Sequence, residues 1–163
     1  MSPFGMAIVV PTLELFANEF QSSYSIIQFI ISAYLFGLAI SQPFMGFLSD
    51  KLGRKPVMIS GIILFIIASY ICMTAETLST LIVSRFLQGV GGSVGTVTSR
   101  AIIRDSYSGD QAAKSLSRVT ATMGMAPMIA PVIGAIALSI SGSPNGIFLI
   151  TLLIGIMILI PVL

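Results

Sequence analysis

The sequence predicts an all-α membrane protein with six transmembrane helices, because it is hydrophobic, poor in charge and divided into long uncharged segments. Its 163 residues are 55% hydrophobic and 9% charged, with a mean hydropathy of +1.02. A soluble domain has about 25% charged residues. No charged residue occurs in residues 20–49, 56–75 or 119–163. Since a membrane-spanning helix needs about 20 mostly apolar residues, these segments are long enough to cross a bilayer.

Short polar segments divide the chain into the predicted helices and loops. Pro56 is expected to open the third helix, where its missing N–H leaves no hydrogen bond unmade, and Gly53 permits a tight turn before it. Residues 141–146 are typical of a turn and separate the last two helices. The helices are predicted at residues 1–17, 24–48, 56–74, 78–103, 117–140 and 146–163. The loops are predicted at residues 18–23, 49–55, 75–77, 104–116 and 141–145, and residues 110–114 could form a short surface helix in the fourth loop.

The basic residues predict how the chain crosses the membrane. Only Arg85 lies deep inside a predicted helix, and Arg100 occupies the last turn of the fourth helix. The others lie in or beside the second and fourth loops: Lys51, Arg54, Lys55, Arg104, Lys114 and Arg118. Positively charged loops remain on the cytoplasmic side, so both chain ends are expected to face the cytoplasm of a bacterium. Apolar sequence runs up to both ends, and a fragment of a longer protein is therefore expected.

Composition argues against several other classes of protein. The chain has no histidine and a single cysteine, Cys72, inside an apolar segment, so no metal cluster and no intrachain disulfide are expected. The net charge of +2 comes from the loop cations and does not indicate a nucleic-acid partner. No buried acidic pair and no nucleophile with a base can be assembled from the sequence. We therefore expect neither an enzyme nor a cofactor.

A short polar segment, Gly46-Phe-Leu-Ser-Asp-Lys-Leu-Gly-Arg-Lys-Pro56, lies between two long apolar ones. Its spacing Gly-x-x-x-Asp-Lys-x-Gly-Arg-Lys resembles the loop between helices 2 and 3 of the major facilitator superfamily of secondary transporters. The matching residues are Gly46, Asp50, Lys51, Gly53, Arg54 and Lys55. The resemblance extends over the chain and implies one half of that fold, which is built from two inverted three-helix repeats.

The same resemblance implies a role for the charges of this loop. In the superfamily the loop helps to hold the two halves together in the outward-facing state. Its aspartate, here Asp50, pairs with the loop arginine, here Arg54, and with an acidic residue at the cytoplasmic end of helix 4, for which Asp105 is the candidate. The alternative is that these charges only fix the topology.

Arg85 is the second candidate site, roughly 12 Å along the fourth helix from its outer end. A charge in the membrane interior costs about 2.5–3.5 kcal/mol, so such a residue normally faces a cavity or a partner. Gln88 and Gly89 lie one turn further on. The pattern Leu81-x-x-x-Arg85-x-x-Gln88-Gly89 resembles the helix-4 motif of proton-coupled superfamily members, where the arginine is linked to proton transfer or substrate contact. The alternative is an arginine that extends to the outer interface.

The fifth predicted helix carries two prolines one turn apart, and each is expected to bend it. Its pattern departs from the Gly-Pro-x-x-Gly-Gly motif of drug antiporters. It resembles the bicyclomycin and chloramphenicol resistance (Bcr/CflA) branch instead, as does the Arg100–Asp105 end of the fourth helix. The residues of the pattern are Gly124, Pro127, Ala130, Pro131 and Gly134. The alternative is a kinked helix in any transporter.

The first helix departs from that branch at one position. Members often carry an acidic residue four positions before a helix-1 proline, but Ala7 precedes Pro11 at this distance. The proton site could lie at Glu14, one turn after Pro11, and Glu14 could equally be an outer-loop charge. The departure leaves the coupling ion open and does not alter the predicted fold.

The resemblance implies the N-terminal half of a twelve-helix transporter, with the substrate site between the two halves. We expect the complete protein to export drugs or small amphipathic compounds in exchange for protons, by alternating access. The expected partners are membrane lipid, the small-molecule substrate, protons and a C-terminal six-helix half. The alternatives are a metabolite or sugar carrier of the same superfamily and a truncated, non-transporting membrane protein.

Overall fold

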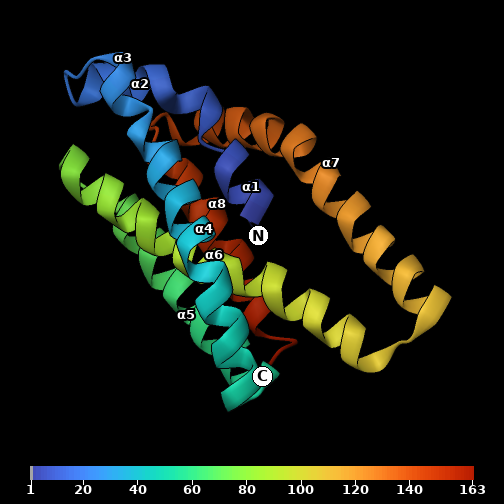
Figure 1. Cartoon of the computed structure of the whole chain (residues 1–163). Helices are drawn as coiled ribbons and strands as arrows, with labels where there is room; N and C mark the ends of the chain where they lie inside the picture. Colours follow the sequence, from blue (N-terminus) through green and yellow to red (C-terminus); the bar gives the residue numbers. More distant parts are fainter. Residues whose placement is uncertain (1) are drawn as a thin grey trace.

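The computed structural model describes residues 2–163, with side chains from Pro3 onward, so Met1 of the first predicted helix lies outside the described residues. Within this range the chain is helical and contains no β-strand, which confirms the all-α class. Six long helical segments follow one another along the chain, and the first two are interrupted (Figure 1).

The first segment is three pieces instead of the single helix predicted over residues 1–17. These are α1 (Ser2–Ala7), the 3-10 helix η1 (Val10–Thr12) and α2 (Leu13–Glu19). Pro11 lies in the middle piece, where it removes a backbone donor. The Thr12 hydroxyl donates to the Val9 carbonyl oxygen at 2.8 Å, which gives a carbonyl at the break a partner. The proline therefore accounts for the interruption.

The second predicted loop, residues 49–55, is nearly all helical. α3 (Tyr24–Ile27) and α4 (Phe29–Leu52) lead to α5 (Arg54–Met73), and only Gly53 separates α4 from α5. Gly53 has φ 95° and ψ 156°, which a residue with a side chain rarely adopts. The tight turn predicted at Gly53 is confirmed, whereas the charged residues on either side of it extend the two helices.

The fourth predicted loop, residues 104–116, is also almost entirely helical. Only Tyr107 and Ser108 separate α6 (Leu78–Ser106) from α7 (Gly109–Ser141). The helix predicted at residues 110–114 does form, as part of α7 instead of as a separate element. Asp110 in the first turn of α7 suits the positive end of the helix dipole. Charged residues mark where a helix leaves the apolar environment, but backbone hydrogen bonding continues beyond that point.

The last two helices are separated where the sequence predicted a turn. α7 ends at Ser141 and is followed by Gly142, whose φ of 64° is the left-handed conformation common after a helix. α8 (Gly146–Leu159) stops before the predicted end at residue 163, and Pro161 follows it. α7 contains Pro127 and Pro131, remains helical across both, and is visibly curved in Figure 1.

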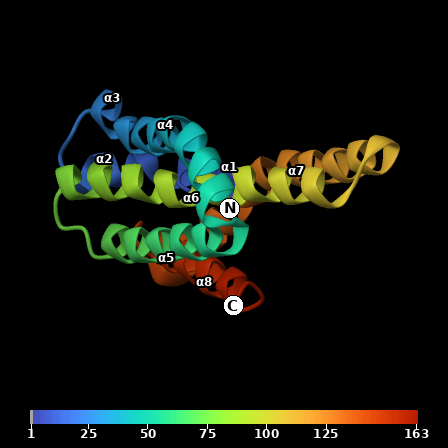
Figure 2. The ribbon, with the colours of Figure 1, turned by 60° about the horizontal axis from the view of Figure 1, so that its bottom comes forward.

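α6 is the central helix and packs between α4 and α5 (Figures 1 and 2). Glycines bring the backbones of α4 and α6 into contact. A Cβ at Gly89 would overlap the Tyr34 carbonyl oxygen, and a Cβ at Gly37 would overlap the Phe86 carbonyl oxygen. The hairpin formed by the end of α6 and the start of α7 projects beyond the other helices in both views.

Three helical segments are long and apolar enough to cross a membrane, judged by length and composition: Tyr24–Leu52, Arg54–Met73 and Gly109–Ser141. α8 is apolar but shorter, and the first segment is broken. α6 has the length, but its polar side chains lower its hydropathy. Several of these are buried against neighbouring helices: Ser84, Arg85, Gln88, Ser93 and Thr98. The weak hydropathy signal of α6 therefore reflects contact with protein.

Candidate functional site

Arg85 is fully buried inside the bundle, with 0% of its surface exposed. Its guanidinium donates to oxygen acceptors on three helices. Nε donates to the Ile30 carbonyl of α4 at 3.3 Å, Nη1 to Gln88 Oε1 of α6 at 2.5 Å, and Nη2 to the Gly5 carbonyl of α1 at 2.9 Å. The side chain is thus held within the protein and does not extend to the outer surface.

Two aromatic rings cover the Arg85 guanidinium. Its Cζ lies 4.3 Å from the ring centre of Tyr34 and 5.9 Å from that of Phe148, distances at which a ring face attracts a cation. Both ion pairs in residues 2–163 belong to Arg54, so no carboxylate in this range pairs with Arg85. The acidic residues of the chain are all exposed: Glu14, Glu19, Asp50, Glu76, Asp105 and Asp110. Carbonyl dipoles and ring faces therefore surround this charge in place of an acid.

Gln88 extends the network of Arg85 to two further helices. Its Nε2 donates to Ser69 Oγ of α5 at 2.7 Å and to Thr151 Oγ1 of α8 at 3.3 Å. Gln88, Ser69 and Thr151 are at most 1% exposed. Through Arg85 and Gln88, one continuous set of hydrogen bonds joins α1, α4, α5, α6 and α8. We refer to Gly5, Ile30, Ser69, Arg85, Gln88 and Thr151 as the arginine network.

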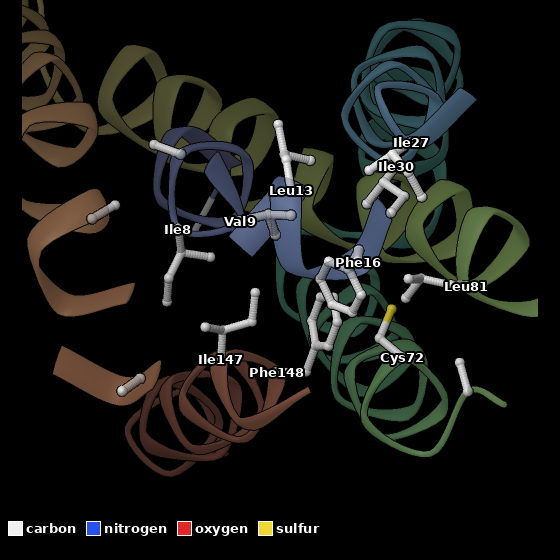
Figure 3. Close-up of a cluster of buried hydrophobic side chains, with 14 residues drawn as sticks. Ile8, Val9, Leu13, Phe16, Ile27, Ile30, Cys72, Leu81, Ile147 and Phe148 are labelled. Carbon is white, nitrogen blue, oxygen red and sulfur yellow. The ribbon is translucent and has the colours of Figure 1, made fainter. Parts of the chain in front are cut away.

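A cluster of buried apolar side chains, drawn in Figure 3, shares Ile30 with the arginine network. Ile30 contributes its side chain to the cluster and its carbonyl to Arg85, and Leu81 precedes Arg85 by one turn of α6. The labelled side chains converge from the surrounding segments: Ile8, Val9, Leu13, Phe16, Ile27, Ile30, Cys72, Leu81, Ile147 and Phe148. Phe148 belongs to this cluster and also covers the Arg85 guanidinium.

A second arginine-centred cluster lies where α4 meets α5. Arg54 Nη1 donates to Asp50 Oδ1 and, at 3.2 Å, to Ser49 Oγ, while Nε donates to Asp105 Oδ2 at 3.0 Å. The side chains of Arg54, Asp50 and Asp105 are 28%, 66% and 55% exposed. Asp50 pairs with Arg54 as the resemblance implied, whereas Asp105 pairs with Arg54 and not with Asp50 in the described residues. These contacts join the α4–α5 turn to the end of α6. We call Ser49, Asp50, Arg54 and Asp105 the turn cluster.

The other residues of the loop motif have simpler surroundings. Lys51 Nζ lies 4.6 Å from the centre of the Phe47 ring one turn earlier. Lys55 is exposed, and its Nζ donates to the Leu163 carbonyl oxygen at 2.7 Å. A Cβ at Gly46 would meet only Val97, at 3.7 Å, which is ordinary packing distance. The structure brings none of these side chains to the arginine network.

The structure also separates Glu14 and the α7 motif from Arg85. Glu14 is exposed on α2 and forms no ion pair within the described residues. A Cβ at Gly134 would overlap the Ile8 carbonyl oxygen, so this glycine lets α7 pack against the break in the first segment. A Cβ at Gly124 would have nothing within 4 Å. Gly134 is therefore needed for the close packing of α7, whereas Gly124 is not.

A pocket of about 490 Å³ is lined by residues of α1, α5, α6, α7 and α8. Its wall is mostly apolar and includes one cation, Arg118; the other lining residues include Met58, Gly95, Thr96, Met123 and Ile158. Arg85 is not among the lining residues, so the pocket and the arginine network are separate features.

Sequence reasoning found Arg85 and Gln88 but missed Gly5, Ile30, Ser69, Thr151 and Tyr34. A backbone carbonyl is available at every residue, so nothing in the sequence identifies Gly5 or Ile30 as acceptors. Thr151 is the only hydroxyl residue in residues 146–163, and that contrast is the signal that could have found it. Ser69 shares its segment with Ser60, Tyr70 and Thr74, so it does not stand out in the sequence. Tyr34 could have been found as a polar aromatic residue in the uncharged second segment.

Fold and site together define a helical membrane protein whose interior holds one cation shared among several helices. The sequence profile of the Major Facilitator Superfamily matches residues 1–163, which is the whole chain. The chain therefore belongs to the major facilitator superfamily.

Several proteins in this superfamily are similar to the chain. It is 35% identical over 156 residues to the "Uncharacterized MFS-type transporter YdgK" of Bacillus subtilis, which covers 95% of this chain and 39% of YdgK. It is 38% identical over 132 residues to "Multidrug resistance protein MdtL" of Escherichia coli, covering 81% of this chain and 34% of MdtL. MdtL of Shewanella sp. is 36% identical over 134 residues, with coverage of 82% and 34%. The chain thus spans little more than a third of the length of these relatives.

Proposed function

We propose that the chain forms the N-terminal six-helix half of a proton-coupled exporter of drugs or small amphipathic compounds. Membership of the superfamily supports transport, and the printed name of MdtL, multidrug resistance protein, supports drugs as substrates. The coverage of 34–39% of each relative is what a second six-helix half would leave. In this proposal the two halves rock about a substrate site between them.

The observation that carries the proposal is the buried, acid-free environment of Arg85. An ionisable residue inside the membrane is costly and is by default a functional residue. Arg85 does not serve to neutralise an acid within residues 2–163, because every acidic residue there is exposed. We propose that its fixed positive charge acts on a proton-binding carboxylate or on substrate supplied by the rest of the transporter.

We further propose that the turn cluster is a gate on the cytoplasmic side. Arg54 ties the α4–α5 turn to the end of α6, and these contacts are exposed enough to exchange with other partners. Rocking of one half against the other requires contacts that form in one state and open in the other. The basic residues at this end support its cytoplasmic location in a bacterial inner membrane.

The proposal places the protein in the Bcr/CflA branch. The sequence pattern over residues 124–134 and the curvature of α7 support this assignment. Proton coupling and antiport are part of the same proposal. A sugar or metabolite carrier would have the same fold, and the identity of the transported compound distinguishes it from a drug exporter.

The proposed function is tested by efflux from bacteria that express the complete protein. Ethidium serves as the amphipathic probe, and its loss from preloaded cells is followed by fluorescence with and without a proton uncoupler. We expect energy-dependent efflux, loss of efflux with Arg85→Ala, and normal efflux with Arg100→Ala. Arg100 is a matched control because it is an exposed arginine of the same helix. Equal efflux from all strains, including one without the transporter, would refute drug export.

A further inference from the structure

We infer that Ser69 of α5 and Thr151 of α8 are positioning residues for Arg85, acting through the carboxamide of Gln88. Neither hydroxyl contacts Arg85. The inference rests on the proposed function only for its transport readout, and the hydrogen bonds that carry it are independent of what is transported.

Both hydroxyls donate their proton to the backbone of their own helix. Ser69 Oγ donates to the Phe65 carbonyl oxygen at 2.7 Å, one turn earlier in α5. Thr151 Oγ1 donates to the Phe148 carbonyl oxygen at 2.9 Å, one turn earlier in α8. A hydroxyl has one proton and two lone pairs. With its proton committed to the helix backbone, each hydroxyl can offer only an acceptor to a further partner.

The Gln88 carboxamide has one orientation that suits all of its partners. Two hydroxyl acceptors select the NH₂ end, and Nε2 lies 2.7 Å from Ser69 Oγ and 3.3 Å from Thr151 Oγ1. The carbonyl end must then point the other way, where Oε1 accepts from Arg85 Nη1 at 2.5 Å. The opposite orientation would set oxygen against oxygen on one side and NH₂ against a guanidinium on the other. The two hydroxyls therefore determine which end of Gln88 faces Arg85.

Water cannot replace the two hydroxyls as the partners that orient Gln88. Ser69, Arg85, Gln88 and Thr151 are at most 1% exposed, and a buried polar group left without a partner is costly. The orientation of Gln88 thus depends on α5 and α8, two helices that form no hydrogen bond with Arg85 itself. A displacement of either helix relative to α6 would release the carboxamide and remove the Gln88 acceptor from Arg85.

The experiment compares Ser69→Ala, Thr151→Val and the double variant in the complete transporter. The controls are Ser139→Ala and Thr74→Val, because both hydroxyls are exposed and, within the described residues, bond only to carbonyl oxygens one turn earlier in the chain. Loss of the partners that orient metal ligands typically lowers activity by about 10-fold to 100-fold, and we expect an effect of similar size here. We expect the double variant to slow ethidium efflux by at least about tenfold and to change the pH profile of efflux. The conservative change Thr151→Ser, which keeps a hydroxyl at this position, should restore the rate and the pH profile. The controls should behave as wild type.

A second background separates positioning from a general loss of packing. If the hydroxyls act through Gln88, adding Ser69→Ala and Thr151→Val to Gln88→Ala should cause no further change in efflux or in the unfolding midpoint in detergent. Additive losses in that background would overturn the inference, as would a double variant with wild-type efflux and pH profile. If wild type exports no ethidium, the proposed function fails. The unfolding midpoints of the same set of variants then still decide whether the hydroxyls act through Gln88.

Discussion

Two arginines organise this protein in opposite ways. Arg85 is fully buried and donates to carbonyl groups and an amide, whereas Arg54 is 28% exposed and pairs with two carboxylates. Each joins helices that are distant in the sequence. The two arginines also differ in their sequence surroundings. Arg54 belongs to a charged motif, whereas Arg85 is an isolated charge among apolar residues.

The number of carboxylates that pair with an arginine is therefore a poor guide to how strongly its substitution affects activity or stability. Exposed ion pairs contribute about 0–1 kcal/mol to stability because water and salt compete with them. A buried guanidinium has no such competition, and its surroundings are arranged to satisfy it. Substitutions at Arg85 should therefore affect activity strongly, and substitutions in the turn cluster should affect stability only slightly.

The largest effect is predicted for Arg85→Met. Methionine is long, flexible and apolar, so it fills most of the space without a charge. The substitution leaves the Gly5 and Ile30 carbonyls and Gln88 Oε1 without their Arg85 donor, and a buried polar group that loses its partner costs about 1–3 kcal/mol. We expect a lower unfolding midpoint in detergent and ethidium efflux at the level of cells without the transporter. A variant that keeps the wild-type midpoint and still exports ethidium would reverse the roles we assign to the two arginines.

The next effect is predicted at the helix contact that keeps Arg85 in reach of Ile30. A Cβ at Gly89 would overlap the Tyr34 carbonyl oxygen of α4, so Gly89→Ala must push α4 and α6 apart. Forcing an extra carbon into such a contact costs typically about 1–3 kcal/mol. Gly124→Ala is the matched control, since its Cβ meets nothing within 4 Å, and helix propensity there gains up to about 1 kcal/mol. Unfolding midpoints of the two variants should move in opposite directions.

The sequence predicted the helix count well because uncharged stretches and charged ends follow from the bilayer itself. It predicted loops poorly at residues 49–55 and 104–116, since charge marks the end of the apolar environment and not the end of a helix. It located Arg85 by its isolation among apolar residues and Gln88 by its place one turn further along the same helix. It could not locate Ile30 or Gly5, because backbone carbonyls gain a role only when another helix approaches them.

A smaller effect is predicted at the turn cluster. Asp105→Asn removes the charge that accepts from Arg54 Nε at 3.0 Å, and exposed pairs of this kind contribute about 0–1 kcal/mol. We expect a small drop in the unfolding midpoint at low salt that disappears near 1 M salt, where the Debye length is about 3 Å. Glu76→Gln, an exposed acid without an ion pair in the described chain, is the control. A salt-independent loss would mean that the cluster is structural in the way that Arg85 is.

The smallest effect is predicted for Glu14→Gln. Glu14 is exposed on α2 and forms no ion pair within the described residues, so its neutralisation should leave both the unfolding midpoint and the pH profile of ethidium efflux unchanged. Glu19→Gln, on the same helix and also exposed, provides the comparison. If Glu14→Gln alone shifted the pH profile, the proton site would lie on the first segment, outside the arginine network. The contrast between the two arginines would then describe the scaffold of the transporter and not the place where protons are bound.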